Sequence, residues 1–162
     1  MKKVKKNLFC YIVASAITLI LISNLEAATL SIGSASGSPG NKNIAIPVNI
    51  TSSSGERVCG FNFDLNFDST KLSFKEVTLG SVAVGAGKSL SYSQPSFNTI
   101  RVVVVGLNQN VIGDGTVLNF TFDILTNTAA GKAEITITKP SLSDPNGKAL
   151  AVNIGGGALE VR

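Results

Sequence analysis

Residues 60–67 read Gly-Phe-Asn-Phe-Asp-Leu-Asn-Phe, and this short stretch carries the clearest structural signal in the chain. Successive side chains of a β-strand point to opposite faces, so a period of two indicates a strand with one buried face. The apolar face would hold Phe61, Phe63, Leu65 and Phe67. The polar face would hold Gly60, Asn62, Asp64 and Asn66. The stretch therefore predicts a strand between a core and solvent.

The same alternation recurs on both sides of this stretch, and no stretch from residue 28 onward has a sustained helical period. The predicted strands are residues 29–33, 43–51, 58–67, 72–79, 89–93, 99–107, 116–125, 132–138 and 157–161. Gly-rich and Ser-rich connections predict loops at residues 33–40, 51–55, 80–87 and 144–147. Nine such strands predict an all-β sandwich of two sheets. Pro47 cannot donate to a ladder, so its strand should lie at an edge or carry a bulge there.

One predicted strand breaks the alternation, because residues 100–107 are apolar on both faces. If Ile100, Val102 and Val104 face the core, then Val103 and Val105 face outward. A contiguous apolar area on the outside of a sandwich marks a docking surface in many proteins. A loop folded over the strand, or simply the high β-propensity of valine, explains the pattern equally well.

The amino-terminal segment has the composition of an export signal. Four lysines precede residues 8–22, an apolar run interrupted only by Ser15 and Thr18, and small residues follow. This order is typical of a secretory signal peptide, and we expect cleavage after Ala27. The alternative is a retained membrane anchor, but 15 residues span only about 22 Å as a helix, against an apolar bilayer thickness of about 30 Å.

Residues 1–27 are therefore predicted to be a signal peptide, and residues 28–162 a single domain that is secreted or held at the cell surface. Contact with a membrane is expected only through the signal. Cys10 lies in that signal, which leaves Cys59 without a partner for an internal disulfide. A buried free thiol and a disulfide to another chain are both compatible with the sequence.

Composition removes several classes of function. Of 14 Lys and Arg and 10 Asp and Glu, four Lys and one Glu precede residue 28, so 10 basic and 9 acidic residues remain. This near balance of positive and negative charge gives no support for a nucleic-acid partner, and none is expected. The chain has no His, which excludes Ser-His-Asp and Cys-His catalysis and His-containing zinc sites.

The order of several motifs along residues 28–162 resembles the cohesin domain, a module that binds dockerins in cellulosome-type assemblies. The match begins with Leu-Ser-Ile-Gly at 30–33 and Ile-Pro-Val-Asn-Ile at 46–50. It continues through residues 60–72, where Ser69 stands in place of the family's usual Pro. Further motifs are Gly-Asp-Gly-Thr-Val-Leu at 113–118, Gly-Lys-Ala-Glu-Ile-Thr-Ile at 131–137 and Gly-Gly-Gly-Ala-Leu-Glu-Val at 155–161. Each motif is weak alone, but their order and spacing are specific.

This resemblance implies a nine-stranded jelly-roll β-sandwich that binds a dockerin-bearing protein, in polysaccharide-degrading or other cell-surface assemblies. The family uses the outer face of one sheet, built from its third, fifth, sixth and eighth strands. Carried over by position, the implied binding residues are Asn62, Val105, Leu107 and Asn108. Asp64, Asn66, Arg101 and Val103 are predicted to join them, because they point outward from the same strands. Gly60 departs from the family, which commonly has a polar residue there. No cofactor is expected, and calcium would belong to the dockerin, because the sequence holds no EF-hand loop.

Direct binding of a polysaccharide is an alternative, since carbohydrate-binding modules have similar sandwich folds. Such binding depends on exposed aromatic rings, and the alternation leaves only Tyr92 and Phe97 for that purpose.

Catalysis is the third possibility, and the sequence predicts that the chain is not an enzyme. A glycosidase needs two carboxylates across a cleft, but Asp64 and Asp123 stand on strands that can belong to different sheets. Other carboxylates fall in predicted turns, at Asp68, Asp114 and Asp144.

Overall fold

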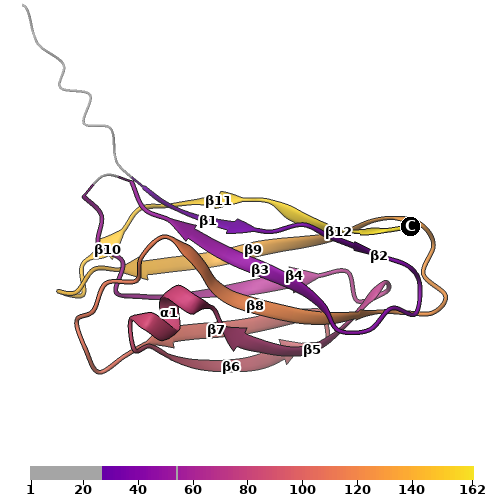
Figure 1. The fold of residues 1–162 in the computed structure, drawn as a ribbon, viewed down its shortest axis with the longest axis horizontal. Coiled ribbons are helices and arrows are strands. Elements are labelled where there is room, and N and C mark those ends of the chain that lie inside the picture. Colours follow the sequence, from indigo (N-terminus) through magenta and orange to yellow (C-terminus); the bar gives the residue numbers. More distant parts are fainter. Residues whose placement is uncertain (1–26, 54) are drawn as a thin grey trace, which may run out of the picture.

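The computed structural model describes residues 27–53 and 55–162, which form twelve strands and one short helix. Nearly all of the predicted signal peptide, residues 1–26, lies outside the described residues. The strands form two sheets, and Figure 1 shows β3 and β8 of one sheet in front of β9, β4 and β7 of the other. The predicted all-β sandwich is confirmed.

The two sheets differ in size, and most neighbouring strands are antiparallel. The five-stranded sheet has the order β11 (Val152–Gly155), β1 (Ala28–Ile32), β3 (Ile44–Thr51), β8 (Gly115–Ile124) and β5 (Leu72–Leu79). The seven-stranded sheet has the order β2 (Ala35–Gly37), β12 (Gly157–Val161), β9 (Gly131–Ser143), β4 (Gly60–Phe67), β7 (Thr99–Val105) and β6 (Ser89–Ser96), and β10 (Ala149–Leu150) pairs with β9.

Nine of these strands occupy the predicted stretches, and the differences lie in short segments and strand ends. Strand β2 and the one-turn helix α1 (Ser81–Gly85) fall where loops were predicted, which corrects both predictions. Strands β10 and β11 were not predicted. Strands β2, β10 and β11 are too short to show a period, and β2 is rich in small residues. Strands β2 and β11 form by pairing with strands distant in sequence, β12 and β1, whereas β10 pairs with β9, which directly precedes it.

Three strands end two or more residues away from their predicted ends. Strand β7 ends at Val105 rather than at Leu107, and Gly106 follows it. Strand β6 continues to Ser96, and β9 continues past Thr138 to Ser143. Both extended strands contain a proline and a register shift. A register shift interrupts the alternation of inward and outward side chains, so the sequence pattern does not indicate that the strand continues.

Pro47 lies in the middle of a sheet, because β3 stands between β1 and β8, and the prediction of an edge strand is wrong. Strand β1 ends at Ile32, and the N–H of the next residue, Gly33, donates to the carbonyl oxygen of Pro47 at 2.7 Å. The N–H and C=O of one strand residue point to the same side, so the absent N–H of Pro47 points to where β1 has ended. The sequence offered a bulge at Pro47 as the alternative to an edge strand. Strand β3 does have a register shift, but it lies between Val48 and Asn49, one residue further on.

The core lies between the sheets and consists of the predicted inward faces. Phe63 of β4 and Phe120 of β8 have ring centroids 6.4 Å apart, and Phe67 and Phe122 have centroids 5.1 Å apart. These rings come from opposite sheets and therefore join the two layers. Burying one such side chain contributes about 1.5–3 kcal/mol. Cys59 is a free cysteine, so within the described residues this apolar contact holds the sheets together without a disulfide.

Candidate functional site

Four strands in the order β9-β4-β7-β6 are consecutive neighbours in the seven-stranded sheet. They correspond to the eighth, third, sixth and fifth strands predicted from the sequence. Asn62 of β4 lies opposite Val103 of β7, and Asp64 lies opposite Arg101. The residues between them are buried, so these four side chains point away from the core. We call the outward surface formed by Asn62, Asp64, Arg101, Val103 and Val105 the β4–β7 face.

The apolar part of the β4–β7 face comes from β7. Val103 and Val105 are 37% and 53% exposed, whereas Val102 and Val104 are fully buried. The sequence left open the explanation that a loop folds over the strand. This exposure excludes it for the described residues. Leu107 is fully exposed, but it follows the end of β7 and is not part of the strand.

Gly60, where the resemblance implied a polar residue, has little room for a side chain. A Cβ atom at this position would come within 3.3 Å of the Cγ1 atom of Val105 and of the carbonyl oxygen of Val104. Contacts that short are tighter than ordinary side-chain packing, so a side chain at position 60 would require these neighbours to shift by a few tenths of an ångström. The glycine therefore leaves room for the exposed side chain of Val105.

Asp64 is held by two cations. Arg101 donates from Nε to Oδ1 at 2.7 Å and from Nη2 to Oδ2 at 2.8 Å, and Lys139 Nζ lies 3.3 Å from Oδ2. The Asp64 side chain is only 5% exposed. The hydrogen bonds from Arg101, with a further contribution from Lys139, hold the pKa of Asp64 below its ordinary value. The carboxylate is therefore charged and already occupied within the chain.

Lys139 reaches Asp64 because β9 carries a bulge. The register of β9 against β4 shifts between Asn62 and Asp64, so that Lys139 and Pro140 stand opposite Phe63. Lys139 has a φ of 51°, in the left-handed region that side chains other than glycine seldom adopt. The bulge breaks the alternation and exposes Lys139 beside Asp64. The prediction of this strand stopped at Thr138 and missed Lys139, although Pro140 is the residue that signals such a bulge.

The two asparagines of β4 differ in what they offer a partner. Asn66 donates from Nδ2 to Thr138 Oγ1 at 2.9 Å and accepts from Thr99 Oγ1 at 2.9 Å, so its amide links three strands. Asn62 is exposed, and its side chain forms no hydrogen bond within the described part of the chain. Asn62 therefore has the amide that is available to another molecule.

Asn108 lies beyond the end of β7 and its side chain is used inside the chain. Its Oδ1 accepts from Lys88 Nζ at 2.9 Å, and its Nδ2 donates to the carbonyl oxygen of Gly87 at 3.0 Å. Lys88 is only 5% exposed, and its Nζ also lies 3.3 Å from Cys59 Sγ. Sequence reasoning missed Lys88, because one lysine in a polar segment carries no periodic signal. These contacts of Asn108 and Lys88 tie the segment that contains Leu107 to the residues just before β6.

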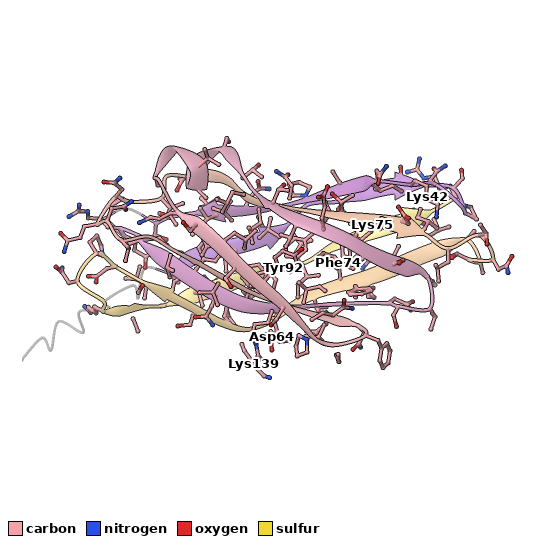
Figure 2. All side chains as sticks on the ribbon, turned by 90° about the horizontal axis from the view of Figure 1, so that it is seen from below. Lys42, Asp64, Phe74, Lys75, Tyr92 and Lys139 are labelled. Atoms are coloured by element: carbon pink, nitrogen blue, oxygen red, sulfur yellow. The ribbon has the colours of Figure 1, made fainter. Side chains whose placement is uncertain are left out.

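The opposite sheet has a similar charged group. Asp123 of β8 lies 3.2 Å from Lys42 Nζ and 3.8 Å from Lys75 Nζ. Figure 2 shows Lys42 and Lys75 on one side of the sandwich and Asp64 and Lys139 on the other. Asp64 and Asp123 thus belong to different sheets, as the sequence allowed, and they do not face each other across a cleft.

The described residues hold neither a metal-binding cluster nor a membrane-spanning helix. Residues 27–53 and 55–162 contain no group of three or more His, Cys, Asp or Glu placed to hold a metal ion. Within the same ranges, no helix has the length and apolar character needed to cross a membrane.

Comparisons with known proteins place the chain in a family. A family model described as the cohesin domain matches residues 28–156, and a search of curated proteins finds no match. Among solved structures, the chain is similar to the sixth cohesin of scaffoldin B from Acetivibrio cellulolyticus, solved with a mutant Cel5 dockerin, with a TM-score of 0.76 and 24% identity over 84% of this chain and 99% of that chain.

Two further structures show the same likeness. A cohesin–dockerin complex from Clostridium thermocellum has a TM-score of 0.74 and 17% identity, covering 84% of this chain and 99% of that chain. A non-cellulosomal cohesin from the archaeon Archaeoglobus fulgidus has a TM-score of 0.71 and 23% identity, covering 84% of this chain and 91% of that chain. At these identities the likeness shows the fold.

Fold and site together define a β-sandwich module with one extended, partly apolar sheet face. Since the family model matches residues 28–156, which is most of the sequence, the chain belongs to the cohesin domain family.

Proposed function

We propose that this chain is an exported, non-catalytic module that binds a dockerin-bearing protein through the β4–β7 face. The observation that carries the proposal is a pair of exposed valines, Val103 and Val105, on a sheet face with polar groups around them. Apolar area rimmed by polar groups is typical of docking surfaces. Membership of the cohesin family supports the choice of partner, and two of the similar solved cohesins are in complex with dockerins.

The physical basis of binding is the removal of Val103 and Val105 from water. Burial of apolar surface contributes about 25 cal/mol per Å². A flat sheet accepts one side of a helix, and Asn62 can form hydrogen bonds at the border of the apolar contact. A small central cluster of this kind dominates the energy of most interfaces.

The test is calorimetric titration of the purified protein with calcium-loaded dockerins encoded in the same genome. We expect binding by the unmodified chain and an affinity at least about tenfold lower in Val105→Asp, because a buried charge costs more than the 1.4 kcal/mol that a factor of ten represents. Val84→Asp is the matched control, since Val84 is 59% exposed on α1. Figure 2 shows this helix on the side of the five-stranded sheet, away from Asp64.

The outcomes are distinct. Equal losses in Val105→Asp and Val84→Asp would mean that the β4–β7 face is not the site. Absence of binding to every dockerin tried, with the chain folded, would contradict the proposed function itself. In this proposal any calcium requirement belongs to the dockerin, so calcium should change binding without changing the melting temperature of this chain alone.

Export is part of the proposal and rests on residues 1–27, with their basic and then apolar composition. The mature protein would be secreted or held at the cell surface. Amino-terminal sequencing of protein recovered outside the cell should begin at Ala28. A chain that stays intracellular with Met1 intact would contradict export without affecting the proposed binding.

Direct binding of a polysaccharide is a second candidate, favoured by one observation. Phe97 is 77% exposed and lines a shallow hollow together with Phe74 and Gln94. Tyr92, labelled beside Phe74 in Figure 2, packs edge-on against it with ring centroids 6.0 Å apart. Retention on cellulose that Phe97→Ala abolishes would support this function, and passage of the unmodified chain without retention would contradict it.

A further inference from the structure

The β4–β7 face, together with Lys139 beside it on β9, carries a small excess of positive charge. On β4, β6, β7 and the part of β9 from Thr136 to Ser143, the charged residues are Asp64, Arg101 and Lys139. One carboxylate against two cations leaves one net positive charge. The nearest further charges on β9, Lys132 and Glu134, pair with each other at 3.0 Å. The charge at the centre of the face is therefore set by this group of three residues.

The exposure of the three charged groups is unequal. The Asp64 side chain is 5% exposed, whereas those of Arg101 and Lys139 are 49% and 75% exposed. Both oxygens of Asp64 already accept hydrogen bonds or an ion pair from these two residues. An ammonium group has three donors and a guanidinium group five, so both cations retain N–H groups for a further acceptor. A molecule that docks here meets donors rather than acceptors.

The cations lie next to the apolar contact. Arg101 and Val103 are two residues apart on β7 and share a face, which separates them by about 6.7 Å along the strand. One turn of an α-helix rises by about 5.4 Å. A helix that meets Val103 with an apolar side chain can therefore meet Arg101 with a residue about one turn away.

We infer that the dockerin partner of this chain presents an acidic side chain to Arg101 and Lys139, about one helical turn from the apolar side chain that packs on Val103. The inference rests on the proposed function and specifies its partner. Charge complementarity of this kind selects among partners and accelerates association more than it raises affinity. A dockerin with a basic residue at that position meets like charge and is rejected.

The test uses the calcium-loaded dockerin that binds the unmodified chain most tightly, and it measures association rates at about 0.05 M and about 0.5 M salt. We expect Lys139→Gln to slow association by about threefold and Lys139→Glu by about tenfold at the lower salt concentration, with smaller differences at the higher one. The matched control is Lys75→Glu, because Lys75 is an exposed lysine beside a buried carboxylate on the opposite sheet. This control should change the rate by less than about twofold. Melting temperatures verify that each variant is folded.

A reciprocal change gives the decisive result. Replacing the acidic residue of the dockerin by lysine should slow binding to the unmodified chain and restore binding to Lys139→Glu. If the dockerin binds but Lys139→Glu associates as fast as the unmodified chain, the inference is wrong and the proposed function stands. Equal effects of Lys139→Glu and Lys75→Glu would also overturn it, because only overall charge would then matter. If no dockerin binds, both the function and the inference fail.

Discussion

The sequence placed Asp64 on the correct face, but the contacts of its side chain differ from those expected of a residue that binds a partner. The alternation of residues 60–67 put it on the outer face, and it lies there. As a carboxylate it would ordinarily accept hydrogen bonds from a partner, but Arg101 and Lys139 already occupy it. Its main effect is to hold Arg101 in place beside Val103, since the guanidinium donates two hydrogen bonds to one carboxylate.

Stability at acid pH should depend on Asp64. Its pKa lies below the ordinary value of 3.8 in the folded chain, chiefly because Arg101 donates hydrogen bonds to it. A carboxyl group of this kind adds stability that is fully present above its unfolded pKa and is lost as the pH falls through the folded pKa. The unmodified protein should therefore lose stability below about pH 4, and Asp64→Asn should lose less. Urea unfolding between about pH 7 and about pH 2 measures this difference.

Asp123 provides a comparison within the same molecule. Its pKa is lowered mainly by the N–H of Asn43, and further by Lys42 and Lys75. Asp123→Asn should also flatten the acid limb of the stability curve, and the two substitutions should add because they lie on different sheets. Parallel curves for Asp64→Asn and the unmodified chain would contradict the role assigned to the Arg101 pair.

Among the elements, the bulge in β9 has the largest effect on the face. It converts a position that alternation would turn inward into an exposed cation, and it does so with a left-handed residue at Lys139. Such a backbone costs roughly 1–2 kcal/mol for any residue other than glycine. The bulge thus places a charge beside Asp64 at some cost in stability.

Two substitutions at one position separate the backbone from the charge. Lys139→Gly and Lys139→Gln both remove the ammonium group, but only glycine adopts the left-handed conformation without strain. We expect Lys139→Gly to be more stable than Lys139→Gln by about 1 kcal/mol. Chemical denaturation of the two variants checks this value. Glycine would be no better than glutamine if the residue left the left-handed region in solution.

The complete sandwich depends on one core, because the described residues hold no disulfide and no metal cluster. Phe120 is fully buried on β8 and its ring lies 6.4 Å from that of Phe63 in the facing sheet. Removing it leaves a cavity between the layers, and large-to-small changes of this kind cost about 3–5 kcal/mol.

Phe120→Ala should therefore unfold the domain at much lower denaturant concentration, in a single cooperative transition. Phe97→Ala, at a ring that is 77% exposed, should change stability by less than about 0.5 kcal/mol. Guanidinium titrations of both variants provide the comparison. Similar losses in the two variants would contradict the assignment of a single core between the sheets.

Local patterns in the sequence were sufficient for the sandwich. Alternation placed Phe61, Phe63 and Val103 on the correct faces, because each position depends only on the period of its own strand. The order of motifs also indicated the cohesin family, which the family model confirms over residues 28–156. The identity of the binding residues remains a prediction.

Features that depend on contacts between distant residues were decided by the tertiary structure. The bulge at Lys139 is a shift in the register between β9 and β4, so it appears only when the two strands pair. The contacts of Asp64 with Arg101 and Lys139 join three strands that become neighbours only in the folded sheet. The hydrogen bond from Lys88 to the side chain of Asn108 joins residues that are 20 positions apart. A period describes one strand at a time, whereas charge pairing and side-chain accessibility are properties of neighbouring strands, and only the assembled sheet determines which strands are neighbours.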